Sequence, residues 1–123
     1  MEPSIKIVKI IKNHTILTQK ATRATTPWAR LKGLLGRPSL SPNEALVLSP
    51  CNSIHTFFMR FPIDAIFIDS RGTVLHLYSH LKPNRMSGLH WRAKEVIEVP
   101  SGTIEQWKVQ VGDILKCEED DDV

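Results

Sequence analysis

The chain has 123 residues, of which 41% are hydrophobic and 24% are charged. These proportions match an ordinary soluble globular domain, and the length is sufficient to bury one hydrophobic core. No apolar run approaches the roughly 18 residues that a membrane helix needs, and the charged N-terminus lacks the apolar segment of a secretory signal. We therefore predict a soluble, cytoplasmic protein with no membrane insertion.

The net charge of +3 is unevenly distributed along the chain. Residues 118–122 contain five of the thirteen acidic side chains, which leaves sixteen basic and eight acidic side chains in the rest. We predict a single basic globular domain over residues 1–117 and a short, acidic, disordered tail over residues 118–123. A basic surface can attract nucleic acid or anionic ligands, although an excess of lysine and arginine on a small domain more often serves solubility.

The first predicted elements are the two strands of an N-terminal hairpin. Apolar residues and lysines alternate over residues 4–13, and residues 15–19 resume an extended pattern. Asn13 and His14 between them are typical of a turn.

A helix is predicted within residues 26–38. Thr26 can cap it, Pro27 suits its first position, and the Gly-Arg-Pro sequence at residues 36–38 is expected to end it. Three residues at helical spacing are expected to form its apolar face: Trp28, Leu31 and Leu35.

Alternating and β-branched patterns return further along the chain. Residues 65–69 are apolar on both faces, which indicates a central strand. The short connections between the predicted strands imply antiparallel packing. These strands cover residues 45–49, 54–59, 65–69, 73–80 and 94–99.

A second helix is predicted over residues 103–110, where Thr103 and Gln106 have the spacing of a capping box. Its expected apolar face consists of Ile104, Trp107 and Val111. A last strand is predicted over residues 114–118. The predicted class is α+β: a mostly antiparallel, strongly bent or barrel-like β-sheet with one or two short helices.

Three ordered blocks of sequence carry a family resemblance. They are WARLKGLLGRPSL, IHTFFMRFPIDAIFIDSRGTV and AKEVIEVPSG, whose most characteristic parts fall on residues 30–37, 55–64 and 98–102. Together they resemble domain-of-unknown-function family 192 of bacteria and archaea. The resemblance implies a compact β-rich domain without an established activity. Many relatives have Trp-Met-Lys-Asn where this chain has Phe-Met-Arg-Phe at residues 58–61.

Cys51 and His55 are the first candidates for chemistry, because a cysteine beside a histidine can act as a nucleophile. In an extended chain their Cα atoms would lie about 13 Å apart, out of hydrogen-bonding reach, although a turn after Pro50 could bring them together. The alternative is a structural cysteine beside a histidine that lines a strand end. Cys51 and Cys117 form no C-x-x-C motif, so we predict free thiols.

The histidine spacing argues against a metal centre. His76 and His80 share one face of a predicted strand, again about 13 Å apart, which is too far to chelate one ion. We therefore predict no metal and no cofactor.

Asp64 shares the strand parity of Ile66 and Ile68 and is expected to be buried. A buried carboxylate needs partners, and Arg60, Arg30 or backbone N–H groups could supply them. We predict a structural anchor, with a ligand-binding or catalytic carboxylate as the alternative. Glu95 and Glu98 should point to opposite faces of one strand, which argues against a catalytic pair of acids.

The long loop over residues 81–94 is a further candidate site, because it combines cationic side chains with an aromatic one. Arg85 and Trp91 could contact an anionic ligand or an acidic protein surface. A single aromatic residue does not make a stacking track for nucleic acid.

These observations favour a non-catalytic ligand-binding, protein-binding or accessory module. The first alternative is a small hydrolase or lyase that uses His55 and Asp64, for which Cys51 is a candidate nucleophile. The second is a polyanion- or nucleic-acid-binding protein. The predicted ligand-binding residues are Cys51, His55, Arg60, Asp64, Arg85 and Trp91.

Overall fold

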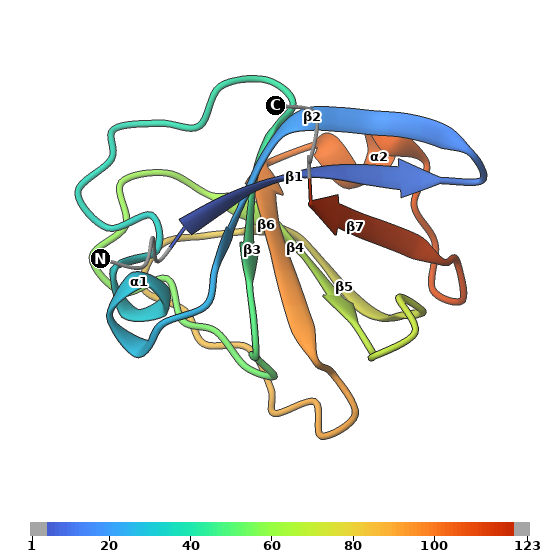
Figure 1. Cartoon of the computed structure of the whole chain (residues 1–123). Helices are drawn as coiled ribbons and strands as arrows, with labels where there is room; N and C mark the ends of the chain where they lie inside the picture. Colours follow the sequence, from blue (N-terminus) through green and yellow to red (C-terminus); the bar gives the residue numbers. More distant parts are fainter. Residues whose placement is uncertain (1–4, 120–123) are drawn as a thin grey trace.

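The computed structural model describes residues 5–119 and contains seven strands and two short helices in that range (Figure 1). In chain order they are β1 (Ile5–Lys12), β2 (Thr15–Ala24), α1 (Pro27–Lys32), β3 (Glu44–Leu48), β4 (Ile63–Ile68), β5 (Val74–Leu81), β6 (Glu95–Pro100), α2 (Thr103–Trp107) and β7 (Leu115–Glu119).

The seven strands form one sheet in the order β5-β4-β6-β3-β2-β1-β7. Only β2 and β3 pair in parallel; every other neighbouring pair is antiparallel. The sheet curls so strongly that its two ends approach each other, as Figure 1 shows. Thr73 forms a bridge with Ile114, and the N–H of Leu115 donates to the carbonyl of Gly72 at 2.9 Å. The predicted α+β class with a bent, mostly antiparallel sheet is confirmed.

The N-terminal hairpin has the predicted turn. Asn13 and His14 both have positive φ angles, 51° and 66°, as a two-residue turn between right-twisted strands requires. Lys12 pairs with Thr15 across this turn.

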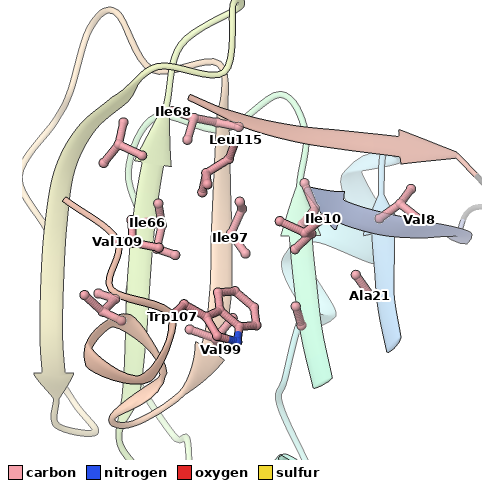
Figure 2. Packing of buried hydrophobic residues seen from close by; sticks show 14 residues of the cluster. Val8, Ile10, Ala21, Ile66, Ile68, Ile97, Val99, Trp107, Val109 and Leu115 are labelled. Carbon is pink, nitrogen blue, oxygen red and sulfur yellow. The ribbon is translucent and has the colours of Figure 1, made fainter. Parts of the chain in front are cut away.

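Two hydrophobic cores lie on opposite faces of the sheet. The first core contains Ile66 and Ile97 and is covered by α2 through Trp107, as Figure 2 shows. The second core contains the next residue of β4, Phe67, and is covered by α1 through Ala29. Because alternate residues of a strand point to opposite faces, one uninterrupted apolar strand contributes to both cores. The prediction of a central strand over residues 65–69 is therefore confirmed.

The helix predicted within residues 26–38 is shorter than expected. Thr26 caps it through a hydrogen bond from the N–H of Ala29, as predicted, but α1 ends at Lys32 because Gly33 takes a φ of 44°. The proposed apolar face was wrong: Trp28 and Leu31 are 71% and 60% exposed. Ala29 is the buried residue of this helix.

The capping box predicted for the second helix was also wrong. Thr103 is the first helical residue, and the N-cap is Gly102, which has no side chain to cap the helix. The carboxylate of Asp64 accepts from the N–H groups of Gly102 and Ile104 instead. The helix ends at Trp107, and Val111 lies beyond it and is exposed.

Residues 54–59 do not form the predicted strand. They form one isolated bridge, between His55 and Met86, and Phe58 has a φ of 65°, which interrupts an extended course. The N–H of Thr56 donates to the carbonyl of Arg85 at 2.8 Å. This segment is therefore held against the loop before β6, and its buried side chains cover the second core.

The C-terminal strand continues through Glu119, which pairs with Val8 of β1. The predicted tail over residues 118–123 thus overlaps β7 at its start, and residues 120–123 lie outside the described part of the chain. Within residues 5–119, neither helix has the length and apolarity needed to cross a membrane.

Candidate functional site

A cavity of about 280 Å³ opens beside the second core. It lies between α1, the segment that follows β3, and the strand β6, so it collects residues from distant parts of the chain. Its polar and ionisable lining residues are Arg30, Lys32, Cys51, Ser53, His55 and Glu98. Its apolar lining residues are Leu31, Leu34, Leu35, Leu48, Ile54 and Met59.

Glu98 is the most unusual residue of this cavity. It lies in the middle of β6, between Leu46 of β3 and Ala65 of β4, and is only 4% exposed. Its carboxyl group forms no hydrogen bond or ion pair with any residue in the described range 5–119. Burial raises the pKa of Glu98 to about 8, so the carboxyl group is mainly neutral at pH 7.

Arg30 brings a cation to the same cavity from α1. Its Nη1 donates to the carbonyl of Pro50 at 3.1 Å. Its buried Nε–H has no acceptor among the described residues. An unpaired buried donor lowers the stability of the fold.

Cys51 lies beside these two groups but is not an activated nucleophile. Its Sγ donates to the carbonyl of Ser53 at 3.1 Å. Burial raises the pKa of the Cys51 thiol, and the nearby Glu98 raises it further. Because the thiolate is the reactive form, a raised pKa lowers the reactivity of this cysteine.

His55 lines the cavity yet is turned toward its neighbour Phe57. Its Nδ1 accepts from the N–H of Phe57 at 3.3 Å, and the two rings stack with centroids 5.2 Å apart. In the described part of the chain, no hydrogen bond joins His55 to Cys51. The structure therefore brings the two predicted residues to one cavity without forming a catalytic pair.

Asp64 lies elsewhere, at the start of β4 on the side of the first core. It is 1% exposed, and its carboxylate accepts from the backbone N–H groups of His80, Gly102 and Ile104 at 2.8, 3.0 and 2.9 Å. Of the predicted partners, the backbone groups are used and the arginines are not. Arg60 is exposed, and its side chain has no hydrogen bond or ion pair within residues 5–119.

The two candidates in the loop before β6 do not line the cavity. Trp91 is 80% exposed, and within residues 5–119 the side chain of Arg85 forms one hydrogen bond, to the carbonyl of Asn84 at 3.4 Å. His90 packs in this loop against His76, with ring centroids 4.5 Å apart, and bonds Tyr78 at 3.0 Å. Over residues 5–119, no group of three or more His, Cys, Asp or Glu side chains is arranged to hold a metal ion.

Glu98 is not among the ligand-binding residues predicted from the sequence. The strand parity of β6 predicted that Glu95 and Glu98 lie on opposite faces, and Glu95 indeed pairs with Arg23 at 3.0 Å on the other side. The sequence feature that could have identified Glu98 is an acidic residue inside an otherwise apolar central strand, where a charge is costly without a partner.

The fold and the cavity define a small, curled, β-rich domain with a cavity between α1 and the sheet. The chain matches the family model DUF192, described as "Uncharacterized ACR", over residues 8–117, and it belongs to that family. A UPF0127 protein of Thermococcus sibiricus is 35% identical over 109 residues, which cover 84% of this chain and 69% of that protein.

Two solved structures share the fold. A protein of unknown function from Novosphingobium aromaticivorans has a TM-score of 0.77 at 18% identity, covering 91% of this chain and 84% of that one. A protein titled a putative transcription regulator from Sinorhizobium meliloti has a TM-score of 0.73 at 22% identity, covering 95% of this chain and 98% of that one.

Proposed function

We propose that this protein is a non-catalytic module that binds a small molecule in the cavity beside Glu98. The observation that carries the proposal is the carboxyl group of Glu98, a buried residue that lines the cavity and whose side chain has no hydrogen-bond partner within residues 5–119, together with the guanidinium-bearing side chain of Arg30 that lines the same cavity. A buried carboxyl group without a partner lowers the stability of the fold, since buried polar groups normally have partners. A ligand that bonds Glu98 would remove this penalty.

The size and lining of the cavity agree with such a role. Its volume of about 280 Å³ is near the lower end for small-molecule sites, and mostly apolar walls with a few polar groups are typical of them. A ligand of roughly one ring in size fits this space better than a nucleotide or a peptide.

The arrangement gives less support to a hydrolase or lyase. The carboxylate of Asp64 is occupied by three backbone donors near α2, whereas His55 lies at the cavity on the other side of the sheet. The Cys51 thiol has a raised pKa and no hydrogen bond from an imidazole base in the described residues. Acyl transfer by such a group would need an activating base in contact with it.

The proposal can be tested with three fragments of one shape and different charge: benzoate, benzamide and benzylamine. We expect at least one of them, at millimolar concentration, to shift the backbone-amide NMR signals of Gly33, Cys51 and Ile54, which line the cavity. The signals of Arg71 and Lys116, which line a separate hollow, should stay in place.

A matched pair of variants identifies the site. Glu98→Leu should abolish the shifts, and Glu95→Gln, on the opposite face of β6, should retain them. The ligand-binding proposal would be wrong if none of the three fragments moved the cavity signals, or if Glu98→Leu bound as the parent does.

A further inference from the structure

We infer that the cavity selects small organic carboxylates: compounds with one carboxylate group on a compact apolar body. This inference rests on the proposed function and names the chemical class of the ligand. It follows from the hydrogen-bonding groups and charges that line the cavity.

The polar groups of the cavity are mainly donors at neutral pH. The protonated carboxyl group of Glu98 has an O–H to donate, and Arg30, which lines the cavity, has guanidinium N–H groups besides the one that bonds the carbonyl of Pro50. The Cys51 thiol already donates to the carbonyl of Ser53. The free donors therefore outnumber the strong acceptors, and a ligand group with two acceptor oxygens complements them.

The charge of the cavity selects among acceptor groups. Arg30 and Lys32 are its cationic lining residues, and a neutral Glu98 supplies no compensating negative charge. An ammonium ligand would be repelled by both cations. A neutral amide could accept the same hydrogen bonds, but a carboxylate gains in addition from the guanidinium group.

The apolar walls of the cavity determine the chemical character of the part of the ligand that lies away from the carboxylate. Leu34, Leu48, Ile54 and Met59 line the cavity, and all four side chains are buried. An apolar body of about one ring would displace water from them. Charged groups beyond the carboxylate would find no partner on this wall.

The protonation state of Glu98 gives the inference a distinctive pH dependence. Binding of a carboxylate requires the neutral form of Glu98, because two adjacent carboxylates repel each other. The fraction of that form falls as the pH rises above about 8. The apparent dissociation constant of a carboxylate should therefore rise about tenfold between pH 7 and pH 9.

The other ionisable side chains that line the cavity are Arg30, Lys32, Cys51 and His55. Burial raises the pKa of Cys51, which keeps the thiol protonated through most of this range. The neighbours of Glu98 on the adjacent strands, Leu46 and Ala65, do not titrate. Glu98 is thus the group whose ionisation should change the affinity for carboxylates between pH 7 and pH 9.

The experiment measures the affinities of benzoate, benzamide and benzylamine by NMR titration of the full chain at pH 7 and pH 9. We expect benzoate to bind at least tenfold more tightly than either other fragment at pH 7, and to lose about tenfold in affinity at pH 9. In Glu98→Gln, whose side chain donates a hydrogen bond without titrating, that loss should disappear. Arg30→Gln should weaken benzoate at least tenfold and change benzamide less than twofold.

Glu95→Gln is the control for a change of charge on the same strand, and it should reproduce the parent in every measurement. Tighter binding of benzamide or benzylamine at the cavity would overturn the carboxylate inference while leaving the proposed function intact. A benzoate affinity with the same value at both pH values would also overturn it. If no fragment binds, the proposed function and the inference fail together.

Discussion

At the scale of single residues, the two buried acidic side chains within residues 5–119 differ in their hydrogen bonding. Asp64 and Glu98 are 1% and 4% exposed, and both lie on central strands. Three backbone N–H groups donate to the carboxylate of Asp64, whereas no residue within 5–119 forms a hydrogen bond with the carboxyl group of Glu98. The three hydrogen bonds to the carboxylate of Asp64 hold β4, β5 and α2 together. The carboxyl group of Glu98 has no such donor and lowers the stability of the fold, and for this reason we assign a ligand to it.

We predict that Asp64→Ala is strongly destabilising. The substitution leaves the N–H groups of His80, Gly102 and Ile104 buried without their acceptor, a loss of about 2–5 kcal/mol in the free energy of unfolding. His55→Ala, at an exposed position, should cost about 1 kcal/mol or less. Urea unfolding followed by circular dichroism measures both. Equal urea midpoints for Asp64→Ala and the parent would show that this carboxylate does not anchor the fold.

At the scale of elements, the turn between β4 and β5 closes the curled sheet onto β7. Asp69 holds the turn by accepting from the N–H groups of Arg71 and Thr73, each at 2.9 Å. Gly72, with a φ of 86°, then passes so close to β7 that a Cβ atom there would lie 2.2 Å from the carbonyl oxygen of Leu115. The close approach of two backbones at this point requires glycine.

We therefore predict that Gly72→Ala destabilises the protein by about 3 kcal/mol or more, because the backbone clash adds to the strain of a positive φ. Gly112→Ala is the matched control. Gly112 has a similar φ of 97° but no atom within 4 Å of an added Cβ, so the strain alone should cost about 1 kcal/mol. Urea midpoints of the two variants give the comparison. A smaller loss for Gly72→Ala than for Gly112→Ala would contradict the proposed contact.

Local sequence patterns correctly predicted the elements whose structure is determined by residues close together in the sequence. The Asn13-His14 turn is encoded in two residues, and the two-faced apolar pattern of β4 directly indicates a central strand. Residues 54–59 have a similar pattern, but their backbone bonds go to the loop before β6, about thirty positions away. The cap of α2 likewise comes from Asp64, which no local motif indicates.

Local sequence patterns also predicted only part of the candidate site. The parity of β6 predicted that Glu95 and Glu98 diverge, and they do. Parity alone could not determine which of the two faces is fully packed and which borders a cavity. That outcome depends on how closely α1 approaches the sheet, and α1 is shortened by the positive φ of Gly33.

At the scale of the whole molecule, the two hydrophobic cores share the same central strands. Successive residues of β4, Ile66 and Phe67, belong to the first and the second core, respectively. If β4 left the sheet, the side chains of both cores would become exposed to solvent. We therefore propose that the described part of the chain unfolds as one cooperative unit, as expected for a single domain of this size.

This proposal predicts that a destabilising substitution in either core lowers the free energy of unfolding of both cores by the same amount. Ile66→Val and Phe67→Leu should each lower the free energy of unfolding by about 1 kcal/mol. Replacing the exposed Trp28 and Trp91 by phenylalanine leaves Trp107, buried in the first core, as the fluorescent reporter. Both core substitutions should then shift the urea midpoints of Trp107 fluorescence and of circular dichroism by the same amount. Should Phe67→Leu move the circular dichroism transition and leave that of Trp107 in place, the two cores would be separate folding units, and the strands they share would not couple them.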